Sequence, residues 1–305
     1  MHQASSFGES YLLWLDESVR GEVLTVGGVM MRTADEVRVV DAWRALKERM
    51  GLDAFGELKH ALNEKHPSRP RLDAAGWTQK HRVPGMLEMI SKQPVLVIVA
   101  TRVDNREGDG RPHPEDYYLD ALMWCAMRFC NAMHRDGRAT QGPHRVTVDY
   151  PTQPDDLENR QVSARLRELY SANPTTAAFQ RYERAWASPT STVASGRMPP
   201  LRRGDLAPSL AATHSQHCDL LQMADVVTGT TNEFVAWNLA EAEGSNLPWP
   251  SYRDKNFQKL RSVVRRSPGG ALRGYGFGLL PEATPAQQQL MEFVEDERAV
   301  DDACA

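Results

Sequence analysis

Four stretches of the chain are largely apolar, and we expect each to form a strand buried in a sheet. They are Tyr11–Leu15, Val23–Met31, Val95–Val103 and His144–Tyr150. The strongest of them, Val95–Val103, is also rich in β-branched residues. Gly21 lies between the first two stretches, so these should pair as an antiparallel hairpin. Two weaker stretches, Ala177–Tyr182 and Gly274–Pro281, are candidates for further strands.

Helical spacing of apolar residues predicts six helices between or after these strands. The ranges are Ala34–Met50, Trp77–Ser91, Glu115–Met133, Leu157–Ser171, Cys218–Trp237 and Asp254–Arg266. Lys65–Leu72 and Ser188–Leu210 contain prolines and basic residues and are expected to be irregular connections. The alternation of strands and helices favours a three-layer α/β fold, with a central mixed sheet and helices on both faces.

The composition is that of an ordinary globular chain: 305 residues, 41% hydrophobic, 25% charged and a net charge of −4. A net charge of −4 excludes a polybasic protein, for which a polyanionic partner could be inferred from the total charge alone. The four cysteines are scattered and form no CxxC pair, which favours a reducing compartment. No secretory signal is visible, and the longest apolar run is far below the roughly 20 residues needed to cross a bilayer. We therefore expect a soluble cytoplasmic protein without a membrane partner.

Several carboxylates follow or interrupt segments of the sequence that are otherwise apolar. Asp16 and Asp149 each follow an apolar strand, and active sites of open α/β sheets collect at the carboxyl ends of strands. Asp225 lies three residues after Gln222 on an otherwise apolar helix, and Glu57 is a fourth candidate acid. Carboxylate oxygens suit Mg²⁺ or Mn²⁺, and one or two such ions can activate water and stabilise the leaving oxygen of a phosphodiester.

Simpler interpretations exist for individual residues. Asp149 could cap a turn, and Glu57 could pair with Lys59 or Lys47. His214, His217 and Cys218 are too few for a zinc site because no second cluster completes the four ligands. The chain also lacks the short motifs of P-loop nucleotide triphosphatases, nucleophile-elbow hydrolases and zinc-binding proteases.

The ordered set of motifs resembles a bacterial and phage family called domain of unknown function 3800, over about residues 10–240. The motifs are LDES at Leu15–Ser18, VGGV at Val26–Val29, ELK at Glu57–Lys59 and LQMAD at Leu221–Asp225. The resemblance implies a fold similar to that of ribonuclease H and retroviral integrase. It also implies a metal-dependent nuclease; some family members occur near mobile elements or phage-defence genes.

Carried over residue by residue, the resemblance assigns four metal ligands. Asp16 would be the first-strand ligand, Asp149 the central-strand ligand and Asp225 the helix ligand, with Glu57 as the acid after the hairpin. Glu17 and Gln222 would orient ligands or substrate around the metal. Lys59 would contact the scissile phosphate.

Charge is distributed unevenly toward the end of the chain. Residues 253–273 contain seven basic side chains against one acid, whereas residues 282–305 contain seven acids against one arginine. Lys255, Lys259 and Arg266 would form an outward stripe that tracks a nucleic-acid backbone, or simply a solvated helix face. We expect one domain over residues 1–281, with a helical insertion at about 34–92 and a basic helix at about 254–266. Residues 282–305 would be an acidic tail.

The sequence therefore favours a metal-dependent nuclease acting on DNA or RNA, and it is compatible with a protein partner or a homodimer. Two alternatives stay open: an inactive module of the same fold that binds nucleic acid or protein, and a small-molecule phosphatase or phosphodiesterase.

Overall fold

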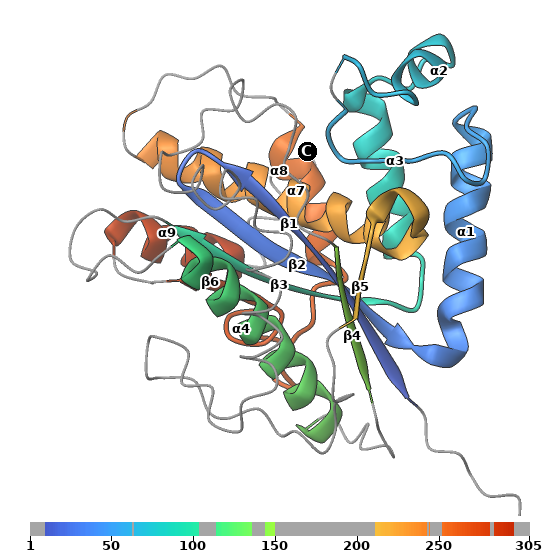
Figure 1. Ribbon diagram of the computed structural model, residues 1–305. Coiled ribbons are helices and arrows are strands. Elements are labelled where there is room, and N and C mark those ends of the chain that lie inside the picture. The colour runs from blue at the N-terminus through green and yellow to red at the C-terminus, as the bar shows by residue number, and fades with distance from the viewer. Residues whose placement is uncertain are drawn as a thin grey trace, which may run out of the picture.

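A six-stranded sheet with the strand order β5-β4-β1-β2-β3-β6 forms the centre of the fold (Figure 1). The computed structural model describes residues 10–62, 64–103, 114–135, 144–149, 211–242, 244, 252–280 and 284–295. The strands are β1 (Tyr11–Arg20), β2 (Val23–Arg32), β3 (Leu96–Val103), β4 (Arg145–Asp149), β5 (Ala211–Thr213) and β6 (Phe277–Leu280). Strand β2 pairs antiparallel with both β1 and β3, whereas the other neighbouring strands pair in parallel.

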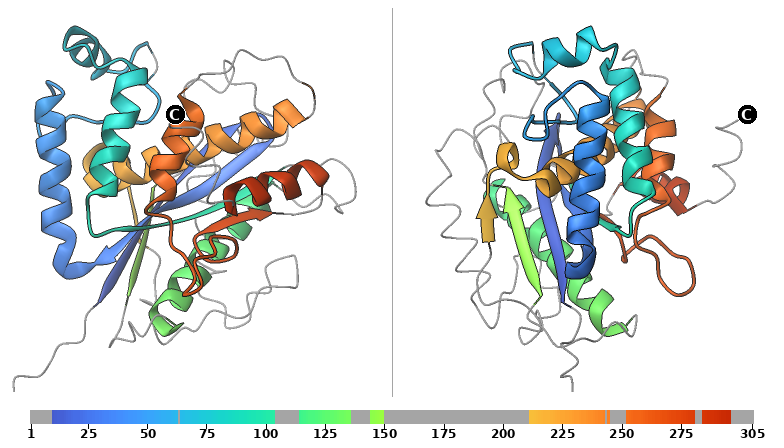
Figure 2. Two further views of the ribbon diagram at one scale, coloured as in Figure 1. Left: turned by 180° about the vertical axis from the view of Figure 1, so that it is seen from behind. Right: turned by 90° about the vertical axis from the view of Figure 1, so that its right-hand side faces the viewer.

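Helices cover both faces of this sheet. They are α1 (Glu36–Arg49), α2 (Arg69–Ala74), α3 (Gln79–Ser91), α4 (Pro114–Arg135), α7 (Asp219–Ala242), α8 (Arg253–Arg261) and α9 (Pro285–Glu295). Two short 3₁₀ helices, η1 (Thr33–Asp35) and η3 (Ser215–His217), precede α1 and α7. Figure 2 shows the sheet from behind and from the side. None of the described helices is long and apolar enough to cross a membrane.

The alternation of side chains along the strands separates the interior into two cores. Leu12, Val29 and Val97 belong to the core on the α7 side, whereas Leu13, Val26 and Ile98 belong to the core on the α4 side. Successive strand residues point to opposite faces, so each buried strand contributes to both cores. This explains why β1, β2 and β3 have nearly continuous apolar sequences.

Helix α7 is the centre of its layer. It packs on β1 and β2 and also contacts α1, α3, α8 and α9. A helix surrounded in this way must be buried on nearly all sides, which explains the small number of charged residues in it. Its polar side chains therefore need partners inside the protein, and this requirement builds the candidate site.

Gly28 allows α7 to lie close to the hairpin. A Cβ atom at Gly28 would come within 1.8 Å of the Trp14 carbonyl oxygen and 3.0 Å of the Ala224 Cβ. No side chain fits in this space, so the glycine in the VGGV motif brings α7 against β1 and β2. The neighbouring residue Asp225 is thereby brought to the sheet.

Most predicted elements that fall within the described residues are confirmed, with shifts of a few residues at their ends. The α/β class, the opening hairpin and the mixed sheet with helices on both faces are as expected. The predicted strand at 177–182, the helix at 157–171 and the connection at 188–210 lie outside the described residues.

Three predictions near the candidate site or the basic segment are wrong. The first strand does not end at Leu15, because β1 continues through the polar residues to Arg20 as part of the hairpin. The proline-containing segment near residue 70 includes helix α2, whose Pro70 lies in the first turn, where a missing N–H is tolerated. The basic helix ends at Arg261, so Arg266 lies outside it.

The segment after residue 281 is not simply a tail. Helix α9 buries Leu290, Met291 and Val294 in the core on the α7 side. At its end, the Glu295 carboxylate accepts hydrogen bonds from the backbone N–H groups of Leu272 and Arg273. An acidic residue thus binds the end of the basic segment within the same chain.

Candidate functional site

Asp16 and Asp149 lie side by side at the edge where β1 and β4 stop pairing. The last parallel pair between these strands is Leu15 with Val148, so each aspartate is one residue beyond it. Leu12 points to the α7 side and Val148 to the α4 side, so alternation places both aspartates on the α7 side. Both side chains are buried, and each residue is only 7% exposed.

The carboxylates of Asp16 and Asp149 are close enough for their negative charges to repel each other. Burial raises the pKa of Asp16 well above its usual range, and the nearby carboxylates of Asp149, Glu17 and Asp225 raise it further. The hydrogen bond from the Glu17 backbone N–H to Asp16 Oδ1, at 2.7 Å, only partly offsets these effects. Asp149 Oδ1 accepts a 2.9 Å hydrogen bond from the backbone N–H of Ser215, at the start of η3. Strands β1 and β4 and helix α7 therefore bring three aspartates together.

Glu17 is the fourth carboxylate in this group. Burial raises its pKa to about 8, and Asp149 and Asp225 act in the same direction, while Lys59 partly offsets them. Its Oε2 atom is buried and accepts no hydrogen bond within the part of the chain that the structure describes. We define Asp16, Glu17, Asp149 and Asp225 as the acid cluster.

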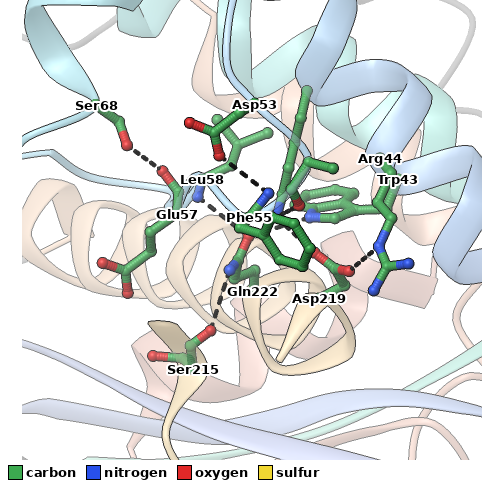
Figure 3. A network of polar contacts seen from close by, with 12 residues as sticks. Trp43, Arg44, Asp53, Phe55, Glu57, Leu58, Ser68, Ser215, Asp219 and Gln222 are labelled. Atoms are coloured by element: carbon green, nitrogen blue, oxygen red, sulfur yellow. Dashed lines mark hydrogen bonds and ion pairs between the residues drawn. The ribbon is translucent and has the colours of Figure 1, made fainter. Parts of the chain in front are cut away.

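Gln222 and Asp225 bind the backbone of the segment at residues 57–60. Figure 3 shows the contacts of Gln222. Gln222 Oε1 accepts hydrogen bonds from the backbone N–H of Leu58, at 3.1 Å, and from Trp43 Nε1, at 3.2 Å. Gln222 Nε2 donates to the Ser215 carbonyl oxygen at 3.1 Å. Gln222 thus connects α1, the segment around Leu58 and the start of α7, and it is buried by these contacts.

Asp225, the second polar residue of the Gln-x-x-Asp motif, binds the same segment two residues further along, at His60. Asp225 Oδ2 accepts a 2.6 Å hydrogen bond from the backbone N–H of His60, and the His60 carbonyl oxygen accepts one from Arg82. A Cβ atom at Gly229 would lie 2.4 Å from the His60 ring, so this glycine leaves the space that the histidine fills. The Gln-x-x-Asp spacing on α7 therefore matches alternate N–H groups of an extended chain.

Lys59 lies between these two anchored residues, and its side chain is partly exposed, unlike theirs. Burial alone would lower the pKa of Lys59, but the carboxylates of Asp225, Glu57 and Asp16 outweigh this effect and raise it. Its ammonium is thus held in the charged state between Glu57 and the acid cluster. Lys59 therefore offsets part of the negative charge of the acid cluster, and the charge of Arg82 also acts on Asp225.

Glu57 is placed differently from the other predicted ligands. Its carboxylate lies 3.1 Å from Lys59 Nζ and 3.0 Å from His66 Nε2. Although burial opposes it, the hydrogen bond with His66 and the charge of Lys59 lower the pKa of Glu57. The interpretation that Glu57 pairs with Lys59 is therefore confirmed, and the pairing with Lys47 is wrong. Glu57 also lies in an irregular segment and not on a helix or strand.

Lys47 instead pairs with an acid that the sequence analysis did not single out. Its Nζ lies 2.5 Å from Asp219 Oδ1, and the Arg44 guanidinium lies 2.8 Å from Asp219 Oδ2. We call these three residues the paired cluster. The position of Asp219, one residue after Cys218 at the beginning of the predicted helix, was a visible signal for a capping acid, but nothing local indicated its partners.

The predicted phosphate-binding residues on and after α8 are partly exposed. Lys255 and Lys259 are exposed, whereas Arg266 is half-buried and donates a hydrogen bond to the Gly270 carbonyl oxygen. Arg253, Arg261 and Arg265 are buried, so much of the basic charge of this segment faces the protein interior. Only two of the three expected side chains thus form an outward stripe on α8.

The chemistry of the acid cluster suits a hard divalent cation, because it offers carboxylate oxygens and one of them is buried without a hydrogen bond. Within the described ranges, no group of three or more His, Cys, Asp and Glu side chains lies in an arrangement that could hold a metal ion. Binding of an ion would therefore require the carboxylates to turn toward a common point.

Scanning the sequence against protein-family models gives no match, and searches of curated proteins and of solved structures give none either.

Proposed function

We propose that this protein is a metal-dependent nuclease that hydrolyses phosphodiester bonds of DNA or RNA. The observation that carries the proposal is the acid cluster, in which burial and neighbouring carboxylates raise the pKa values of Asp16 and Glu17. Taking carboxylates out of water without enough counter-charge is costly. A bound divalent cation is the partner that would remove this cost.

In this proposal Asp16, Asp149 and Asp225 hold one or two Mg²⁺ or Mn²⁺ ions. The ions would supply a nucleophilic water and stabilise charge on the phosphate. Glu17 stands next to the ligands and supplies the buried oxygen without a partner. We assign Glu57 to Lys59 and His66 and not to the metal, because both of its oxygens already have partners.

Among the described residues, Lys59 is well placed to contact the scissile phosphate. Its ammonium is charged, partly exposed and adjacent to the acid cluster. Gln222 acts through the backbone: by binding Leu58 it holds the segment that carries Lys59. Gln222 is therefore a positioning residue in this proposal and does not touch the substrate.

The ribonuclease-H-like fold is part of the same proposal. Support comes from the mixed sheet with its opening hairpin, from helices on both faces, and from acids placed by β1, β4 and α7. The resemblance to domain of unknown function 3800 implies that the LDES and LQMAD motifs, which carry Asp16 and Asp225, lie close together in the fold. The long helical segment between β2 and β3 contributes the extended segment that α7 binds.

The test is a nuclease assay with single- and double-stranded DNA and RNA in the presence of Mg²⁺ or Mn²⁺. We expect cleavage by the wild type, and a loss of at least about 100-fold in Asp16→Asn and in Asp225→Asn. Asp35→Asn is the matched control, because Asp35 is a similarly buried aspartate outside the site that pairs with Arg32. Cleavage that survives Asp16→Asn and Asp225→Asn unchanged would contradict the proposal.

The same assay separates the two alternatives. An inactive binding module would bind oligonucleotides without metal-dependent cleavage. A small-molecule phosphatase would hydrolyse phosphomonoesters or small phosphodiesters and leave polynucleotides intact.

A further inference from the structure

Phe55 is a large aromatic side chain that stands in solvent beside the candidate site. It is 84% exposed, more than any other large hydrophobic residue in the described part of the chain. It lies two residues before Glu57 and four before Lys59. Four residues span at most about 14 Å of extended chain, so the ring is within reach of a polymer bound at Lys59.

The backbone that carries Phe55 is held on several sides. Asp53 accepts hydrogen bonds from the backbone N–H groups of Phe55 and Gly56, each at 3.0 Å. Lys47 Nζ donates to the Ala54 carbonyl oxygen at 3.3 Å, and Arg71 donates to Asp53 Oδ2 at 3.1 Å. A turn fixed in this way keeps the ring out of the core, although burying a phenylalanine side chain would contribute about 1.5–3 kcal/mol.

The surroundings of Phe55 are unlike those of a protein-binding surface. Such surfaces gather several apolar and aromatic side chains at their centre. The other exposed large hydrophobics in the described residues are Val37, in the first turn of α1, and Phe293 on α9, which stacks on Phe234. Phe55 instead follows Asp53, which pairs with the exposed Arg71, and Ala54, whose carbonyl oxygen accepts a hydrogen bond from Lys47.

We propose that Phe55 stacks on an unpaired nucleobase of the substrate, a few nucleotides from the scissile phosphate. Proteins that bind single-stranded nucleic acids combine exposed aromatic side chains, on which bases stack, with cationic side chains nearby, and Arg71 and Lys47 bind the residues just before Phe55. This inference rests on the proposed nuclease function, and it specifies the substrate as a strand that is single-stranded where it crosses the turn at Asp53–Gly56.

The test measures binding and cleavage separately. A single-stranded DNA and a single-stranded RNA carrying a 5′ fluorophore are titrated with the protein in the Asp16→Asn background, and anisotropy gives the Kd. We expect Phe55→Ala to raise the Kd about tenfold and Phe55→Trp to restore it, because base–aromatic stacking contributes about 1–3 kcal/mol per base. Val37→Ala is the control, since Val37 is also exposed but lies in the first turn of α1, whereas Phe55 lies in the loop that follows this helix.

An oligonucleotide with 2-aminopurine at successive positions then identifies the stacked base, whose fluorescence should be quenched by the Phe55 protein and not by Phe55→Ala. Unchanged affinity in Phe55→Ala, or no binding of either oligonucleotide, would overturn the inference; the former would point to a protein partner for the ring. Absence of metal-dependent cleavage in the wild type contradicts the nuclease proposal alone, because the binding measurement does not require turnover.

Discussion

Two groups of charged side chains lie beside the first turns of α7, and they differ in how their carboxylates are balanced by cations. In the paired cluster, Asp219 has a cation on each carboxylate oxygen, at 2.5 Å from Lys47 and 2.8 Å from Arg44. In the acid cluster, four carboxylates influence one another; the charge of Lys59 acts on Glu17 and that of Arg82 on Asp225, yet the pKa values of Asp16 and Glu17 stay raised. Both groups include an aspartate of the same helix, Asp219 in one and Asp225 in the other.

This difference distinguishes an acid that stabilises the fold from acids that are available to bind a ligand. An acid whose role is to hold the fold is paired, because an unpaired buried charge costs several kcal/mol. A cluster that remains under-compensated costs stability in the absence of a ligand, and such sites are frequently functional. The comparison makes opposite predictions for neutral substitutions in the two groups.

The largest expected effect is on the paired cluster. Asp219→Asn removes the partner of Lys47, whose side chain is only 1% exposed, and leaves that ammonium buried without a counter-charge. We expect the free energy of unfolding to fall by about 4 kcal/mol, measured by urea denaturation. Asp73→Asn is the control: its pair with Arg69 is exposed, so its loss should cost under about 0.5 kcal/mol. Equal effects of the two substitutions would contradict the assignment of Asp219 as a structural acid.

The next effect concerns Gln222, which lies between the two clusters. Gln222→Leu would leave the backbone N–H of Leu58 and the Trp43 Nε1–H without their acceptor in a buried environment. We expect a loss of about 3 kcal/mol in the free energy of unfolding. Gln288→Leu, at an exposed position of α9, should change stability by under about 0.5 kcal/mol. A Gln222→Leu protein as stable as the wild type would show that these hydrogen bonds contribute little.

A substitution in the acid cluster should have the opposite sign. Asp16→Asn removes a charge that burial and three carboxylates disfavour, and it keeps an oxygen for the Glu17 backbone N–H. At neutral pH and without divalent cations, we expect the free energy of unfolding to rise by about 1 kcal/mol. Asp35→Asn should instead lower it, because Asp35 accepts two hydrogen bonds from Arg32. Destabilisation by Asp16→Asn would contradict the claim that the cluster is under-compensated.

The stability of the protein should also depend on pH through Glu17. Burial, Asp149 and Asp225 raise its folded-state pKa from 4.5 to about 8 despite Lys59. The bound proton favours the folded state fully below about pH 4.5, and this contribution is lost as the pH rises through 8. Without divalent cations, the Tm should therefore fall by a few degrees more in the wild type than in Glu17→Gln between pH 5 and 8.5. Parallel Tm curves for the two proteins would show that Glu17 does not titrate in this range.

Much of the fold follows from local sequence patterns. The apolar runs identified β1 to β4, and the helical spacing identified α1, α3, α4 and α7. The extension of β1 to Arg20 was missed because Asp16, Glu17 and Ser18 interrupt the apolar run, whereas β2 supplies a paired neighbour along the whole length of the strand. Strand β5 has only three residues, and none of them is buried, so it leaves no pattern to detect.

The candidate site was predictable only in part, for a related reason. Asp16, Asp149 and Asp225 stand out because each interrupts an apolar element. The contacts of Gln222 with Leu58 and of Asp219 with Lys47 join residues 164 and 172 positions apart, and no local signal indicates such pairs. Phe55 also gave no signal, because a single aromatic residue in a sequence is far more commonly buried.

The most direct test of the central claim, that the acid cluster binds a divalent cation, is isothermal titration calorimetry with MnCl₂ at pH 8. The account predicts that the wild type binds Mn²⁺ and releases protons as it does so. The proton release is detected because the measured binding enthalpy then depends on the ionisation enthalpy of the buffer. The account also predicts at least about tenfold weaker binding by Asp16→Asn and unchanged binding by Asp35→Asn. Absence of Mn²⁺ binding, or equal affinity of the wild type and Asp16→Asn, would contradict it.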